Sequence, residues 1–190
     1  MIYYENTLKL RETDPSLPYL VHQRLDYLVQ ETLRCKVPYS WRRIAHPHEP
    51  NTTVIYLRSA TQLGLAGEQA VQLELNVADA VMFNLNFCFP IKHPIPGTTK
   101  KRSMNLPMAI LPDVLARQCE GAGLSLQSHS ANSPYLERYL KKKQSFTLQC
   151  NPVSVVAEIK DVALAEQAVV YGIGRKRVFG YGQLSNLEVL

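Results

Sequence analysis

Short stretches in which apolar and polar residues alternate recur along this chain, and they restrict its fold more than any other feature of the sequence. In residues 71–77, Val and Leu alternate with Gln, Glu and Asn, and residues 83–89 alternate in the same way. Successive side chains of a strand point to opposite faces, so this pattern is typical of strands with one buried face. Further strands are predicted at residues 1–10, 39–44, 53–59, 146–150 and 153–159.

Helical patterns are fewer. Residues 14–18 read Asp-Pro-Ser-Leu-Pro, which supplies a cap and early-turn prolines. The apolar spacing that follows predicts a helix with one apolar face, ending at about Arg34. Two shorter helices are predicted, over residues 111–118, ending at Gly121 or Gly123, and over residues 164–171, ending at Gly172.

This order of elements indicates the fold class. Strands with sparse helices occur first in residues 1–78 and again in residues 79–190. We therefore predict an α+β protein of two tandem ferredoxin-like domains with these bounds, each an antiparallel sheet with helices on one face. Since ferredoxin-like folds carry many functions, the architecture alone indicates none of them.

The charge of the chain favours an anionic partner. The formal net charge is +5, and 46% of the residues are hydrophobic against 19% charged, a globular balance. Neighbouring cations displace condensed counterions from a polyanion together, so clustering matters more than net charge. Many of the cations gather in four clusters: Arg42 and Arg43; Lys100, Lys101 and Arg102; Arg138, Lys141, Lys142 and Lys143; and Arg175, Lys176 and Arg177.

The cysteines and the apolar segments exclude other classes of protein. Cys35, Cys88, Cys119 and Cys150 are scattered without a C-x-x-C pair, so a zinc site or a disulfide framework is not expected. No apolar run reaches the roughly 18 residues that a spanning helix needs. Residues 1–5 do not read as a signal peptide. We expect a soluble cytoplasmic protein that holds no structural zinc and does not enter a membrane.

The most specific local motif is a glycine-rich loop over residues 172–182, in which two G-x-G elements flank a basic, aromatic turn. Its glycines are Gly172, Gly174, Gly180 and Gly182. Glycines let the backbone approach a phosphate chain, and adjacent cations neutralise it. A dinucleotide-binding motif follows a strand and opens a helix, whereas this loop follows a predicted helix. A glycine-rich turn with solvated charges is the alternative from the residues alone.

An apolar helix, a G-x-G loop and a closing strand together resemble the glycine-rich signature of the RAMP superfamily. Within it, the chain is similar to the repeat-processing endoribonucleases of CRISPR systems, and to the subtype E enzymes of Cascade in particular. Two other stretches carry the resemblance: residues 19–23, Tyr-Leu-Val-His-Gln, and residues 71–107, which include the basic run at residues 100–102. Residues 125–144 match nothing in the family's pattern.

The resemblance implies a metal-independent endoribonuclease without a cofactor. It would bind the stem-loop of a CRISPR repeat in the precursor transcript and cut at the base of the stem. It would then stay on the mature guide RNA with other subunits of an effector complex. The implied catalytic residues are Tyr19 and His22, and the implied RNA-binding residues are Lys100, Lys101, Arg102, Arg175, Lys176, Arg177 and the four glycines of the loop.

Histidine suits this chemistry, because its ordinary pKa of about 6.5 lets it accept and return a proton near neutral pH. Helical spacing puts Tyr19, His22 and Asp26 on one strip, where Tyr19 would contact the phosphate or the attacking group and Asp26 would orient the ring. Taken alone, a single helical histidine is more often a residue without chemistry.

Two other functions remain open. One is a non-catalytic RNA-binding subunit of the same superfamily, in which His22 has no role. The other is a tandem ferredoxin-like module that binds proteins or small molecules, with its charges only solvated.

Overall fold

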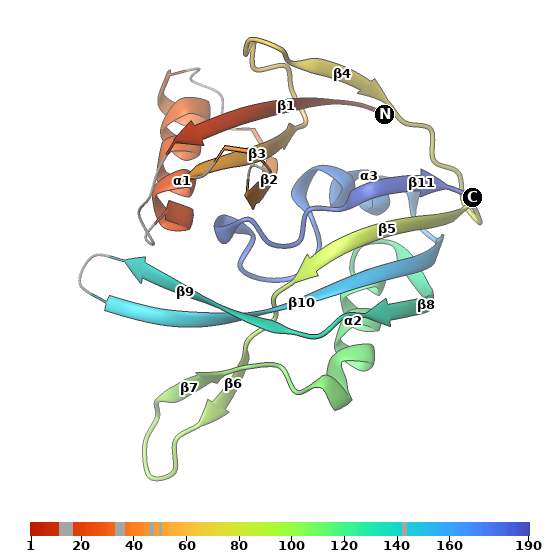
Figure 1. Ribbon diagram of the computed structural model, residues 1–190. Helices are drawn as coiled ribbons and strands as arrows, with labels where there is room; N and C mark the ends of the chain where they lie inside the picture. The colour runs from red at the N-terminus through yellow and green to blue at the C-terminus, as the bar shows by residue number, and fades with distance from the viewer. Residues whose placement is uncertain (12–16, 33–36, 46–47, 50, 142–143) are drawn as a thin grey trace.

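The computed structural model describes residues 1–11, 17–32, 37–45, 48–49, 51–141 and 144–190. It is an α+β fold of two larger antiparallel sheets and a small hairpin (Figure 1). The strands are β1 (Ile2–Arg11), β2 (Tyr39–Ala45), β3 (Thr52–Ser59), β4 (Gln69–Gln72), β5 (Ala80–Phe87), β6 (Ile91–Pro94), β7 (Lys101–Met104), β8 (Leu124–Ala131), β9 (Tyr135–Lys141), β10 (Gln144–Ile159) and β11 (Ser185–Val189). The helices are α1 (Leu17–Asp26), the π-helix η1 (Tyr27–Thr32), the 3₁₀-helix η2 (Met108–Ile110), α2 (Leu111–Glu120), α3 (Val162–Tyr171) and the 3₁₀-helix η3 (Arg177–Phe179).

The two sheets repeat one arrangement. The first has the order β2-β3-β1-β4 and the second β11-β5-β10-β8, so each places its first strand between its third and fourth. The second follows a complete β-α-β-β-α-β path through α2 and α3, as a ferredoxin-like unit does. The first has α1 between β1 and β2 but no helix in the described residues between β3 and β4. The predicted fold class is confirmed.

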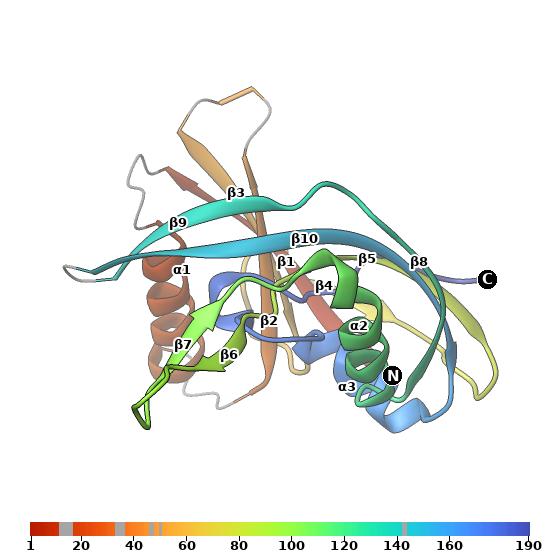
Figure 2. The ribbon, with the colours of Figure 1, turned by 90° about the horizontal axis from the view of Figure 1, so that it is seen from below.

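Each sheet has a core built from its alternating residues. In the first, Val21, Leu25 and Val29 lie on one side of α1 and η1 and pack with Trp41 and Ile55. In the second, alternate apolar residues of β5 and of the second half of β10 are fully or almost fully buried and pack with α2 and α3 on one face of the sheet (Figure 2). The alternation in residues 83–87 therefore reports burial directly.

Several predicted elements differ in extent. The strand predicted over residues 71–77 ends at Gln72, which pairs with Ile2, the first residue of β1. Beyond this pair, β1 has no further strand residue with which residues 73–77 could pair. The helix expected to reach Arg34 changes to a π-helix at Tyr27. The two strands predicted around Pro152 are one strand, β10, whose first half pairs with β9 and whose second half pairs with β5 and β8.

Residues 125–144, which matched no family pattern, contain most of β8 and all of β9. Several predictions lie outside the described residues: the helix cap at residues 14–16, Cys35, and Lys142 and Lys143. The domain boundary between residues 78 and 79 falls in the segment that joins β4 to β5, and it stays a prediction. In the part of the chain that the structure describes, helices are too short or too polar to cross a bilayer.

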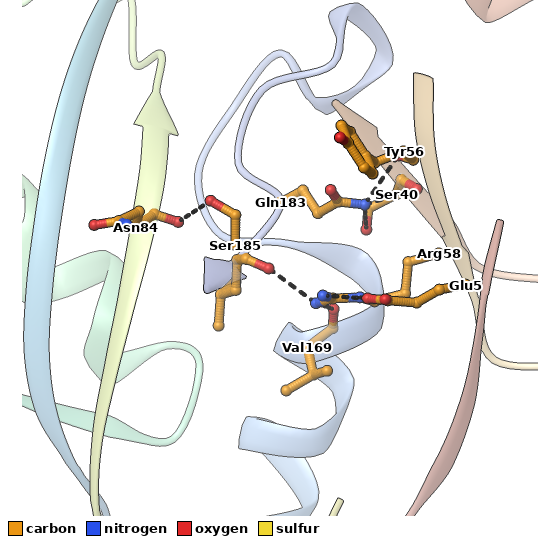
Figure 3. Close-up of polar contacts among 9 residues, drawn as sticks. Glu5, Ser40, Tyr56, Arg58, Asn84, Val169, Gln183 and Ser185 are labelled. Carbon is orange, nitrogen blue, oxygen red and sulfur yellow. Dashed lines mark hydrogen bonds and ion pairs between the residues drawn. The ribbon is translucent and has the colours of Figure 1, made fainter. Parts of the chain in front are cut away.

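Polar side chains join the two sheets (Figure 3). Arg58 of β3 is almost fully buried, and its Nη1 donates to the carbonyl oxygens of Val169 and Leu184 at 2.9 and 3.0 Å. Gln183 Nε2 donates to the carbonyl oxygens of Ser40 and Tyr56 at 3.2 and 3.3 Å. The glycine-rich loop, which ends just before Gln183, is therefore held against the first sheet.

Candidate functional site

A cavity of about 710 Å³ lies where α1 and η1 of the first unit face η3 in the glycine-rich loop. Tyr19 and His22, one helical turn apart on α1, both line it. Lys176 lines it from the loop. The fold thus brings together three of the residues predicted for catalysis or RNA binding from opposite ends of the chain.

One edge of the His22 ring is enclosed. Its Nδ1 is buried and has no hydrogen-bond partner among the described residues. Nε2 is therefore the ring nitrogen that a ligand in the cavity can reach. His22 is the sixth residue of α1, beyond the free amides of the first turn, so the helix end contributes little charge at the ring. Positive charge near the ring comes instead from Lys176.

Asp26 has other partners than His22. Its Oδ1 accepts hydrogen bonds from the Tyr39 hydroxyl at 3.0 Å and from Gln30 Nε2 at 2.8 Å. Burial, followed by the charge of Asp26, raises the pKa of Tyr39, so this hydroxyl stays protonated and donates. The expected orientation of the His22 ring by Asp26 has no support in this geometry.

The three adjacent cations of the loop point to different places. Arg175 lies over the ring of Phe89, 4.2 Å from its centroid, and donates to the carbonyl oxygen of Pro90 at 3.2 Å. Arg177 lines a second cavity beside His22. Of these three cations, therefore, Lys176 and Arg177 share a cavity wall with His22, whereas Arg175 points elsewhere.

A buried polar cluster, absent from the sequence predictions, holds this loop in place. Glu137 of β9 accepts hydrogen bonds from the hydroxyls of Tyr139 and Tyr181 and forms an ion pair with Arg43 at 3.1 Å. Burial raises the pKa of both tyrosines, which keeps the two hydroxyls protonated as donors. Because Tyr181 lies two residues beyond the end of η3, the cluster fixes η3 opposite α1.

Aromatic packing continues from this cluster to the cavity wall. The Tyr139 ring stacks on Phe146 and meets Phe179 edge-on, with centroids 5.5 and 5.1 Å apart. Phe146 and Phe179 both line the cavity, and Tyr19 packs against the same group of rings. Residues 135–141 could not be found from sequence, because their side chains do not alternate cleanly between apolar and polar.

The glycines of the loop have a packing role. Ile173 N donates to Gly182 O at 2.7 Å, and Gly182 N donates to Asn86 O at 3.0 Å, so the ends of the loop are tied together and to β5. Gly172, Gly180 and Gly182 are buried, and Gly174 is partly exposed. Contact of these glycines with RNA stays a prediction.

Gly182→Ala is expected to destabilise the fold by about 2–3 kcal/mol, because a Cβ in the left-handed region is strained and neighbouring atoms must shift. Gly182 has φ +83°, and an added Cβ would lie 2.3 Å from the carbonyl oxygen of Ile173. Gly97 has φ +73° with nothing within 4 Å of such a Cβ, so Gly97→Ala is expected to cost only about 1 kcal/mol. Urea unfolding of both variants measures the difference, and equal losses would contradict the packing role.

The predicted basic run at residues 100–102 lies away from the cavity. Lys101 and Arg102 belong to β7, which pairs with β6 as an exposed hairpin that projects from the second sheet (Figure 1). Lys100 is in the turn just before β7 and is also exposed. The run was expected in a loop, and it stands instead on a two-stranded arm.

No group of three or more His, Cys, Asp or Glu side chains in the described residues is placed to hold a metal ion. The cysteines that the structure describes, Cys88, Cys119 and Cys150, are buried free thiols. Burial raises the pKa of each, to about 12, 12 and 11 in that order, so they stay protonated at neutral pH. Nucleophilic chemistry by these thiols is therefore not expected.

Comparison with known proteins identifies the fold. No family model and no curated protein matches the sequence. Among solved structures, CRISPR-associated Cas6e of Escherichia coli K-12 is 21% identical, with all of both chains covered and a TM-score of 0.70. Thermus thermophilus Cse3, bound to an RNA that represents a pre-cleavage complex, is 18% identical over 100% of this chain and 98% of its own, with a TM-score of 0.68.

A chain of a CRISPR RNA-guided surveillance complex is also similar. It is 15% identical over 98% of this chain and 100% of its own, with a TM-score of 0.67. At these identities the likeness shows a shared fold over the whole length. It agrees with the tandem α+β fold that the order of strands and helices predicts.

Proposed function

We propose that this protein is an endoribonuclease that binds the stem-loop of a CRISPR repeat in precursor RNA and cuts at the base of the stem. The observation that carries the proposal is the cavity at which Tyr19, His22 and Lys176 meet. The fold shared over the whole chain with the CRISPR endoribonuclease Cse3 supports it. The basic arm of β6 and β7 offers a second, separate surface for RNA.

The residues at the cavity supply what a metal-independent cut requires. His22, which a ligand in the cavity reaches at Nε2, would take the proton from the 2′-hydroxyl next to the scissile phosphate. The 2′-oxygen would then attack phosphorus, and the bond to the 5′-oxygen would break as that oxygen receives a proton from a water molecule, to which His22 then returns the proton that it took. Lys176 would offset the charge that develops on the phosphate, and Tyr19 would position it. The products would be a 2′,3′-cyclic phosphate and a 5′-hydroxyl.

The test is cleavage of a labelled repeat hairpin in EDTA, with binding measured on the same samples. We expect cutting at one position at the base of the stem. A polymerase should be unable to extend the 3′ end of the upstream product, because a cyclic phosphate blocks it. Extension should become possible after acid has opened the cyclic phosphate and phosphatase has removed it. Tight hairpin binding without cutting would contradict the enzyme and favour the non-catalytic RNA-binding subunit.

We further propose that the protein stays on the hairpin of its product and joins other subunits of an effector complex in the cytoplasm. Similarity to a chain of a CRISPR RNA-guided surveillance complex supports this. Co-purification of the cut hairpin with the protein, and of partner subunits expressed beside it, tests the proposal. Release of the product at the rate of cutting would contradict it.

The exposed arm leads to a separate prediction about binding. Replacing Lys100, Lys101 and Arg102 by Gln should weaken hairpin binding and reduce the slope of log affinity against log salt by about one for each phosphate that the arm no longer neutralises. The rate of cutting at saturating protein should not change, because the arm lies away from His22.

A control for the arm is the triple variant of Lys9, Arg117 and Lys160 to Gln, which removes the same charge from exposed positions elsewhere. Its salt slope should stay near that of the parent. Equal slopes for the two triple variants would show that the arm acts through net charge only.

A further inference from the structure

The cavity at His22 is the first of three that adjoin one another. A second, of about 270 Å³, shares His22, Asp26 and Val178 with the first. A third, of about 280 Å³, shares Tyr171 and Arg177 with the second. Because neighbouring cavities have wall residues in common, the three lie in a row, here the track, that leads from His22 along the glycine-rich loop to the junction of α2 and α3.

The second cavity combines aromatic surface with a cation. Trp41 and Tyr39 line it from β2, and Tyr171 borders it at the end of α3 with 41% of its surface exposed. The Trp41 Nε1–H is buried and has no hydrogen-bond partner among the described residues. Arg177 stands between the second and third cavities, with Nη1 3.3 Å from the carbonyl oxygen of Tyr171. Of these rings Tyr171 is the exposed one, and an exposed aromatic ring beside a cation is typical of surfaces that bind single-stranded nucleic acid.

The third cavity has a different lining, which suits a sugar-phosphate backbone. Gly121, Ala122 and Ala168 contribute almost no side-chain bulk there, so a chain can approach closely. Among the described residues that line the second and third cavities, Asp26 is the one acid, and its Oδ1 is engaged by Tyr39 and Gln30. A phosphate that lies along this track therefore meets Arg177 and little negative charge.

We propose that the second and third cavities hold unpaired RNA that continues from the scissile phosphate, away from the stem. One base stacks on Tyr171, and a phosphate lies against Arg177. This inference rests on the proposed function, because that function puts the scissile phosphate at His22. A duplex keeps its bases stacked inside, whereas an unpaired strand can place a base on an aromatic ring. The second cavity is slightly smaller than a drug-sized site, roughly 300–1,000 Å³, which suits a single base.

The test measures affinity for hairpins that cannot be cut because they carry a 2′-deoxy nucleotide at the cleavage position. One hairpin ends a single nucleotide beyond that position, and the other continues for six unpaired nucleotides. We expect the parent to bind the long form more tightly. Tyr171→Ala should lose about tenfold in affinity for the long form and nothing for the short one, since the stacking of one base is worth roughly that factor.

Two further variants separate stacking from charge. Tyr171→Phe keeps the ring and should behave as the parent does. Arg177→Gln should lower the salt dependence of long-form binding, whereas Lys9→Gln, an equal charge change at an exposed position of β1 that lines none of the three cavities, should not. Equal weakening of both RNA forms by Tyr171→Ala, or an affinity of the parent that ignores flank length, would overturn the track.

This design distinguishes failure of the proposed flank binding from failure of the proposed cleavage, because binding is measured on RNA that cannot be cut. Flank-dependent binding by a parent that never cuts normal RNA supports the track and overturns the proposed cleavage. Cutting of normal RNA with no dependence of binding on the flank keeps the cleavage and overturns the track. Failure to bind either hairpin overturns both.

Discussion

His22→Ala is expected to lower the rate of hairpin cutting by roughly a hundredfold or more, with affinity for the hairpin unchanged. General acid–base catalysis by a positioned side chain contributes about 10²–10⁴ to a rate. Binding should survive, because the exposed arm at residues 100–102 lies away from the cavity. The measurement is a single-turnover rate at saturating protein beside an affinity for uncleavable RNA.

A second histidine serves as the control. His129 is half-buried on β8, the edge strand of the second sheet, and lines none of the cavities described above. His129→Ala should therefore cut at the rate of the parent. If His22→Ala also cut at that rate, then His22 would only occupy the wall of the cavity, and another group would take the proton.

Most of the sheet structure was predictable because burial and pattern coincide. Phe83, Leu85 and Phe87 alternate in the sequence and are all buried in β5. The same reasoning fails at β8, where Ser, Gln and His fill an edge strand with mostly exposed or half-buried side chains and leave no apolar period to read. It also fails beyond Gln72, where a regular pattern continues after the partner strand has ended.

The site was predictable only in its local part. Tyr19 and His22 lie one turn apart on a helix, so their shared side follows from spacing, and both line the cavity. That Lys176 faces them depends on how the glycine-rich loop packs against the first unit. That packing is set by the bonds of Gln183 to the first sheet and of Tyr181 to Glu137, which join residues far apart in the sequence and leave no local pattern. The catalytic and RNA-binding roles themselves stay predictions.

Arg58→Met is expected to be the most destabilising of the changes proposed, at about 3–5 kcal/mol. The guanidinium donates to two buried carbonyl oxygens and, through Nε and Nη2, to Glu5 at 2.9 and 2.7 Å (Figure 3). A methionine fills similar volume but leaves the carbonyls of Val169 and Leu184 unpaired, at a cost of about 1–3 kcal/mol for each. Loss of the ion pair adds less, because the Glu5 side chain is 43% exposed and regains water.

Arg42→Met is the matched control for Arg58→Met. Arg42 lies on β2 of the same sheet and stacks over Tyr56, 4.0 Å from the ring centroid, a contact worth about 0.5–1 kcal/mol at a half-exposed site. Glu5→Gln is a second control, because it weakens the ion pair and keeps the two carbonyl bonds, so its cost should also fall well below that of Arg58→Met. Urea unfolding at fixed pH measures all three. If Glu5→Gln cost as much as Arg58→Met, the ion pair within the first sheet, rather than the carbonyl bonds to the second unit, would account for the loss. If Arg42→Met cost as much, the loss would reflect the removal of any arginine from this sheet.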